Sequence, residues 1–172
     1  AEYPVVTAEK GYGTVKLVFN KQAMPTISPY ISAFTGGFFA SQIPEDASVT
    51  IENANIVLLQ RLMHKARSYQ GVNFDLELKD TTLTINALGK SAHSSKPSDG
   101  INAIPYLADL LSDTRWAHNG PGTLVNFISD NIGLGLEGKK FGNIAYRDDF
   151  MGAMTVSPTV IKQHDNTIEL NI

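Results

Sequence analysis

The sequence contains no cysteine, which excludes a disulfide framework and thiolate metal ligands. It has no apolar run of the roughly 18 to 20 residues that a membrane-spanning helix requires. It also lacks an excess of positive charge, because 14 Lys and Arg stand against 17 Asp and Glu and the net charge is −3. Proteins that bind nucleic acid need a basic surface to neutralise phosphates. We therefore expect neither nucleic acid nor a membrane among its partners.

A chain of 172 residues, 42% of them hydrophobic, is long enough for one large domain or two small lobes. Its first residues, AEYPVVTAEKG, lack the basic and then apolar layout of a secretory signal. Together with the absence of cysteine, this favours a cytoplasmic location. The chain starts without Met and stops within an alternating run at 167–172, whereas natural termini are usually polar. We therefore expect 1–172 to be a single domain excised from a larger protein.

Alternation of apolar and polar residues predicts most of the strands. The pattern has a period of two over 13–20, 48–52, 74–79 and 83–88. We expect the last two of these segments to pair as a hairpin, and 155–163 to pair with 167–172 in the same way. Residues 30–39 are predicted to form a strand or irregular edge with a bulge at Gly36 and Gly37.

Apolar residues at helical spacing predict two helices among these strands. The first begins at an Asn53 or Asn55 cap and runs to about Tyr69. The second begins near Asn102, which places Pro105 in the first turn, where proline is tolerated. Residues 123–132 fit helix or strand, and we favour helix. The predicted fold class is α+β, with antiparallel strands, helices on one face and two similar half-lobes, 12–80 and 81–172.

The sequence gives little support for a metal site or a nucleotide-binding site. The chain has four histidines, and their spacing matches no zinc motif such as H-E-x-x-H, so we predict no metal site in this chain. Residues 133–138 match G-x-G-x-x-G, but dinucleotide binding needs a preceding strand and a following helix, and the residues that follow make a poor helix. We interpret that stretch as a flexible loop.

His93 differs from the other histidines in its setting. It follows a predicted strand end and a corner of small residues, and it precedes a polar loop with Pro97 and Gly100. A lone histidine is more often structural, but an imidazole on such a rigid platform can donate a hydrogen bond to a developing oxyanion. No G-x-S-x-G elbow is present, so we expect the flanking serines to satisfy backbone groups of the loop: Ser91, Ser94 and Ser95.

Residues 89–104, GKSAHSSKPSDGINAI, resemble the lid or dimerisation-domain motif of the di-zinc aminoacylase/carboxypeptidase/dipeptidase superfamily, roughly G-x-x-A-H-x-x-x-P-x-x-G-x-N-A-[IV]. The opening AEYPVVTAEKG, the segment DDFMGAMTVSP at 148–158 and the closing TIELNI are similar to the dipeptidase V branch. The resemblance spans nearly the whole chain. It implies a ferredoxin-like lid inserted into the catalytic domain of a cytoplasmic dipeptidase.

The resemblance also implies roles for particular residues. Two zinc ions would be bound by the catalytic domain of the same polypeptide, and His93 would reach over them to stabilise the tetrahedral intermediate of dipeptide hydrolysis. Ser41 stands where relatives carry an asparagine that contacts substrate, so it becomes a substrate-binding candidate. The isolated chain is then expected to bind no zinc and to hydrolyse nothing. A non-catalytic dimerisation or interaction module of α+β type is the competing interpretation.

Overall fold

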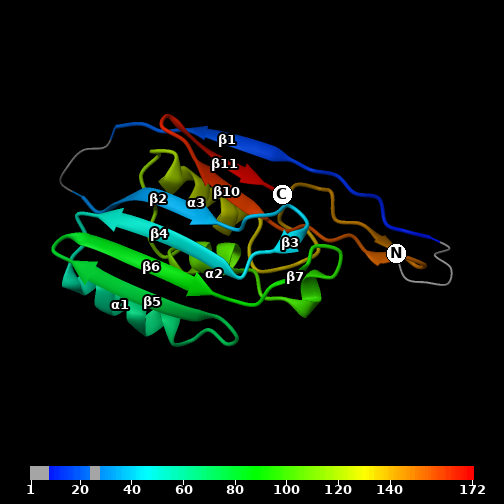
Figure 1. The fold of residues 1–172 in the computed structure, drawn as a ribbon, viewed down its shortest axis with the longest axis horizontal. Helices are drawn as coiled ribbons and strands as arrows, with labels where there is room; N and C mark the ends of the chain where they lie inside the picture. The colour runs from blue at the N-terminus through cyan, green and yellow to red at the C-terminus, as the bar shows by residue number, and fades with distance from the viewer. Residues whose placement is uncertain (1–7, 24–27) are drawn as a thin grey trace.

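A computed structural model describes residues 8–23 and 28–172; the first seven residues of the opening motif lie outside them. In this described part, seven strands form one antiparallel sheet in the order β1-β11-β10-β2-β4-β6-β5 (Figure 1). Their bounds are β1 Lys16–Asn20, β2 Tyr30–Gly36, β4 Asp46–Glu52, β5 Asn73–Lys79, β6 Thr82–Leu88, β10 Val160–Gln163 and β11 Thr167–Asn171. Two short pairs stand beside it, β3 (Gln42–Ile43) with β7 (Ala92–His93) and β8 (Arg147–Asp148) with β9 (Gly152–Ala153).

Three α-helices in the described chain pack against one face of this sheet: α1 (Ile56–Ala66), α2 (Ala103–Leu110) and α3 (Pro121–Asn131). One continuous core joins them to the strands, because alternate side chains of β4 and β6 are buried while their neighbours are not. Ile104, Leu107 and Val49 are completely buried within it. The prediction of an α+β fold with antiparallel strands is confirmed.

Both predicted helix starts are found. Asn55, rather than Asn53, caps α1, because its side chain accepts a hydrogen bond from the Leu58 N–H at 2.9 Å. Asn102 caps α2 by accepting from the Ile104 N–H at 3.1 Å, so Pro105 lies in the first turn as expected. The ambiguous segment 123–132 is helical, since it falls almost entirely within α3.

The predicted hairpin of β5 and β6 has the expected register, with Leu76 opposite Ile85. The prediction of a bulge at Gly36 and Gly37 was wrong, because the irregularity in β2 lies between Ile31 and Ala33. Gly36 is needed for packing instead: a Cβ there would lie 2.8 Å from Ile104 Cγ1 on α2. The strand predicted over 155–163 is shorter, since β10 starts at Val160.

The proposed half-lobes 12–80 and 81–172 stay a prediction. Strands of the two ranges are intermixed in the single sheet, because β6 lies between β4 and β5, and β10 and β11 lie between β1 and β2. Towards one edge, β5 packs under α1, and towards the other, β1 and β11 pack under α3. The two halves therefore share one hydrophobic core in the described chain.

Candidate functional site

His93 is the last residue of β7, at the end of the main sheet where β2 and β6 finish (Figure 1). There β7 pairs with β3, which places Gln42 opposite His93. These two strands come from segments about fifty residues apart in the sequence. We call residues 39–43 and 89–101 the corner, because both segments turn there.

Backbone hydrogen bonds hold the corner together. Lys90 and Ile101 exchange two of them, at 2.9 and 2.8 Å, and so close the base of the loop that carries His93. The Gly89 N–H donates to the Glu45 carbonyl at 2.7 Å, and the Ser94 N–H donates to the Ser41 carbonyl at 2.9 Å. The corner is thus bonded on both sides of His93, as expected for a rigid platform.

Small residues make this close approach possible. A Cβ on Gly89 would lie 2.1 Å from the Ile101 carbonyl oxygen, and one on Gly100 would lie 2.7 Å from the Lys90 carbonyl oxygen. Both distances are too short for real atoms, so any side chain there would push the strands apart. Pro97 is buried beneath the loop, in the short 3₁₀ turn η1 (Pro97–Asp99). Gly89 and Gly100 are therefore required for the close backbone contacts that shape the corner.

The His93 ring is exposed to solvent and is oriented by Ser95. Its Nδ1 lies 2.8 Å from the Ser95 Oγ, and the Ser95 backbone N–H donates to the same nitrogen at 3.2 Å. Nε2, on the opposite edge of the ring, makes no hydrogen bond within the described part of the chain. The prediction that the serines only satisfy backbone groups was therefore incomplete, since Ser95 contacts the imidazole itself.

Ser41 lies close to His93, as its predicted role requires. It is exposed, and its carbonyl accepts the hydrogen bond from Ser94, the residue that follows the histidine. Next to it, Gln42 donates to the Ser91 Oγ at 2.5 Å. Phe38 and Phe39 precede this turn and are 74% and 65% exposed, which is unusual for aromatic side chains. The structure thus brings Ser41 and His93 together, while a substrate contact by Ser41 stays a prediction.

The remaining histidines lie elsewhere. His64 is on α1, His118 precedes α3, and His164 lies 3.6 Å from Glu169 beside β11. In the part of the chain that the structure describes, no group of three or more His, Asp or Glu residues could hold a metal ion. No helix among the described residues is long and apolar enough to cross a membrane.

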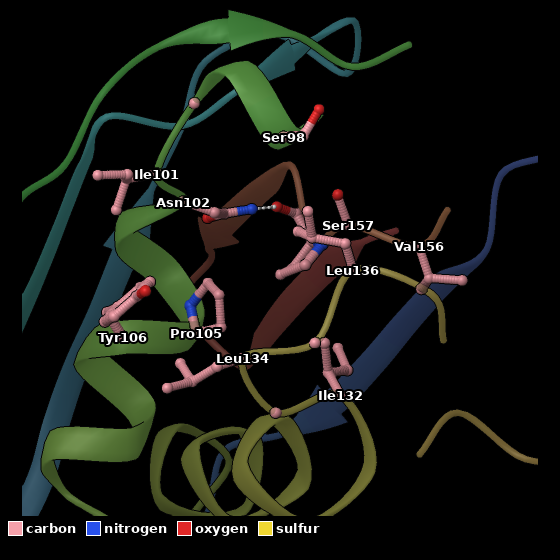
Figure 2. A pocket seen from close by; sticks show the side chains of 14 residues that line it. Ser98, Ile101, Asn102, Pro105, Tyr106, Ile132, Leu134, Leu136, Val156 and Ser157 are labelled. Carbon is pink, nitrogen blue, oxygen red and sulfur yellow. Dashed lines mark hydrogen bonds between the residues drawn. The ribbon is translucent and has the colours of Figure 1, made fainter. Parts of the chain in front are cut away.

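A cleft of about 220 Å³ opens behind the corner, between α2 and the loop that follows α3 (Figure 2). At its rim the Asn102 side chain donates to the Pro158 carbonyl at 2.7 Å, which ties the start of α2 to the segment that leads into β10. The sequence placed Asn102 only at the start of the second helix and within the family motif. This second bond depends on a residue 56 positions away.

The G-x-G-x-x-G stretch lies at this cleft but lacks the setting of a nucleotide site. Gly133, Leu134, Gly135 and Leu136 line the cleft, and the element before them is the helix α3 instead of a strand. A dinucleotide fingerprint needs a strand before it and a helix N-terminus facing the phosphates. Between 139 and 146 the structure has no helix and no strand. The stretch is a loop, as the sequence indicated.

Three groups among the described residues have shifted pKa values. Burial, followed by the hydrogen bond to Asp109, raises the pKa of Tyr69, whose hydroxyl donates to that carboxylate at 2.5 Å. The hydrogen bond from Lys16, at 2.8 Å, lowers the pKa of Glu169. Lys139 similarly lowers the pKa of Glu137. The Tyr69–Asp109 contact ties the segment after α1 to α2, and the Lys16–Glu169 pair joins β1 to β11.

Comparison with known proteins matches this chain to a peptidase family and to proteins named as dipeptidases. The family described as "Peptidase dimerisation domain" matches residues 81–171, just over half of the chain. The "Beta-Ala-Xaa dipeptidase" of Lactobacillus delbrueckii subsp. lactis is 26% identical over 93% of this chain and 33% of its own length. "Putative dipeptidase YtjP" of Bacillus subtilis (strain 168) is 26% identical over 91% of this chain and 34% of its own. The chain thus spans about a third of the length of the curated relatives it matches.

Proposed function

Because this chain belongs to the peptidase dimerisation domain family of the M20 peptidases, we propose that it is the lid domain of a zinc-dependent dipeptidase. In this proposal His93 stabilises the tetrahedral intermediate of peptide hydrolysis. The observation that carries it is the mounting of His93: an exposed imidazole on a corner held by backbone bonds, with its Nε2 edge turned away from its own loop.

The chemistry assigned to His93 is that of an electrophilic hydrogen-bond donor. When water adds to a peptide carbonyl, negative charge develops on the carbonyl oxygen. A donor already aimed at that position stabilises the charge without having to reorganise during the reaction. Nε2–H suits this task, because Nδ1 is occupied by Ser95. The peptide of the substrate would therefore lie beyond Nε2.

The described residues offer no site for the zinc ions of the proposed parent enzyme. No cluster of three or more possible ligands exists among the described residues, so the residues present do not fit a metal centre. We assign the ions to a catalytic domain outside this chain, where they would activate the attacking water. That domain is the partner of this lid, and the isolated chain is expected to be inactive.

Ser41 and the cellular location complete the proposal. The Ser41 side chain is exposed next to His93, so its hydroxyl could contact the same dipeptide. The names of the relatives, which are dipeptidases, support a small peptide as the substrate. Those relatives are about three times as long as this chain. We propose a cytoplasmic enzyme, in line with the lack of cysteine.

The test is His93→Ala in the full-length parent enzyme. Removal of one oxyanion donor lowers turnover by about 10² to 10³, and metal content should stay at the wild-type value because His93 is not a ligand. His64→Ala is the matched control, since His64 is an exposed histidine on α1. Turnover of His93→Ala within twofold of wild type would remove His93 from the mechanism.

Dimerisation is a second candidate function, and the edge of the sheet supports it. In the described chain the seven-residue strand β5 pairs only with β6, so the backbone N–H and C=O groups of alternate residues on its outer side have no strand partner. Beside it, α1 exposes Ile56 and Val57. Sedimentation of the purified chain separates the two functions: a lid that works within its own polypeptide is monomeric, and a dimerisation module sediments as a stable dimer.

A further inference from the structure

We propose that Ser95 is a positioning residue that holds the neutral His93 ring in its Nε2–H tautomer, with Nε2 facing away from the loop. The inference starts from two contacts to one nitrogen. The Ser95 N–H donates to Nδ1 at 3.2 Å, and the Ser95 Oγ lies 2.8 Å from the same atom.

The backbone contact favours one tautomer, and the hydroxyl, which can donate to the same nitrogen, strengthens that preference. A neutral imidazole carries one proton, on either Nδ1 or Nε2. If the proton were on Nδ1, it would point at the hydrogen of the Ser95 N–H, and that amide would lose its acceptor. With the proton on Nε2, the Nδ1 lone pair accepts from Ser95. The hydrogen-bond partner of one ring nitrogen thus determines the state of the other.

The loop itself is fixed, so Ser95 is held in place. The Ser94 N–H donates to the Ser41 carbonyl at 2.9 Å, and the Lys96 N–H donates to the His93 carbonyl at 2.9 Å. These two bonds flank Ser95 on both sides and form a tight turn that returns its N–H to the histidine ring. No other group among the described residues bonds to the His93 ring. Ser95 is therefore what orients the imidazole in this chain.

The tautomer of His93 is a property of this chain and does not depend on the proposed function. The effect of Ser95 on turnover does rest on the proposed function. In the parent enzyme, a ring that spends part of its time with Nδ1–H outward would present a lone pair where a donor is needed. Loss of the Ser95 hydroxyl should lower kcat by about 3- to 10-fold, the usual range for one hydrogen bond. KM should change little, because the contact acts through the transition state.

The tautomer can be measured directly by ¹⁵N NMR of the imidazole nitrogens in the 172-residue chain, on the alkaline plateau of a pH series, where the spectrum of the neutral ring no longer changes. We expect the wild-type Nδ1 signal at the position of a non-protonated nitrogen and the Nε2 signal at that of a protonated one. In Ser95→Ala the ring loses the hydroxyl and keeps only the 3.2 Å backbone contact, so the two signals should move part of the way toward each other as the other tautomer becomes populated.

Two further variants make the test specific. Ser95→Thr keeps a hydroxyl at the same place and should restore the wild-type signals. Ser94→Ala is the matched control, because the hydrogen bond of Ser94 to Ser41 uses its backbone. A wild-type ring protonated on Nδ1, or a Ser95→Ala spectrum identical to wild type, would overturn the inference. If the tautomer is held by Ser95 but His93→Ala retains full turnover in the parent, the proposed function fails and the positioning role stands.

Discussion

The body of the domain and its corner are stabilised in different ways. In the body, side chains from all three helices and the inner face of the sheet are buried together, many of them completely. The corner buries few apolar side chains and depends on backbone hydrogen bonds and on glycines that allow strands to touch. Burial of apolar area supplies most of the folding free energy. The hydrogen bonds of the corner contribute less to folding, but their defined geometry fixes the position of one side chain, that of His93.

From this difference we expect mutations in the body and in the corner to have different effects, the first on the free energy of unfolding and the second on the geometry of His93. A change in the body should lower the free energy of unfolding and leave the His93 geometry intact in the molecules that remain folded. A change in the corner should alter the His93 geometry at a smaller cost in stability. The predictions below test this separation, beginning with the largest expected effect.

Leu107→Ala should lower the free energy of unfolding by about 2 to 5 kcal/mol, because it leaves a cavity at a completely buried position. The measurement is urea unfolding of the isolated chain. His93→Ala is the comparison and should change stability by no more than about 0.5 kcal/mol, since the ring is exposed. Equal losses from the two variants would show that the corner contributes to the core after all.

Gly89→Ala should disturb the corner, because the added methyl would lie 2.1 Å from the Ile101 carbonyl oxygen. We expect a loss of about 1 to 3 kcal/mol in the free energy of unfolding. The amide resonances of Ala92 and His93 should shift, since the base of their loop must open. Gly13→Ala is the control, because no atom lies within 4 Å of the added methyl there. Unchanged His93 resonances in Gly89→Ala would contradict the role assigned to this glycine.

Tyr69→Phe should have the smallest effect, about 1 kcal/mol at neutral pH, from the lost hydrogen bond to Asp109. Burial and Asp109 raise the pKa of Tyr69 above its unfolded value of about 10. The folded state therefore holds this proton while the unfolded state releases it, and stability falls as the pH rises above about 10. Unfolding at pH 8 and pH 10.5 should show a smaller alkaline loss in Tyr69→Phe. Tyr146→Phe, at a position 67% exposed, should behave like wild type.

Local periodicity predicted those parts of the fold that depend on neighbours in sequence. The hairpin of β5 and β6 and the placement of Pro105 in the first turn of α2 followed from patterns within about fifteen residues. The bulge was misplaced because glycine in a strand signals either an irregularity or a close contact. Only the packing of α2 against Gly36 shows which of the two applies.

The candidate site also has features that the sequence predicted and features that only the tertiary structure shows. The family pattern around His93 singled out this residue and implied a role that stays a prediction, but it did not show what contacts the ring. The contact with Ser95 depends on a turn that is held in place by the hydrogen bond from Ser94 to Ser41, more than fifty positions away. The tie between Asn102 and Pro158 likewise joins distant segments. Sequence spacing alone does not place such partners.

The sequence by itself determined the class of the domain, most of its strands and helices, and the histidine most worth testing, because alternation, caps and short motifs are local properties of the chain. Only the tertiary structure decided the order of the strands, the pairing of β3 with β7 and the direction in which the His93 ring faces. The physical reason is that a pleated strand dictates which of its side chains share a face, whereas the identity of the neighbouring strand depends on the packing of the whole chain.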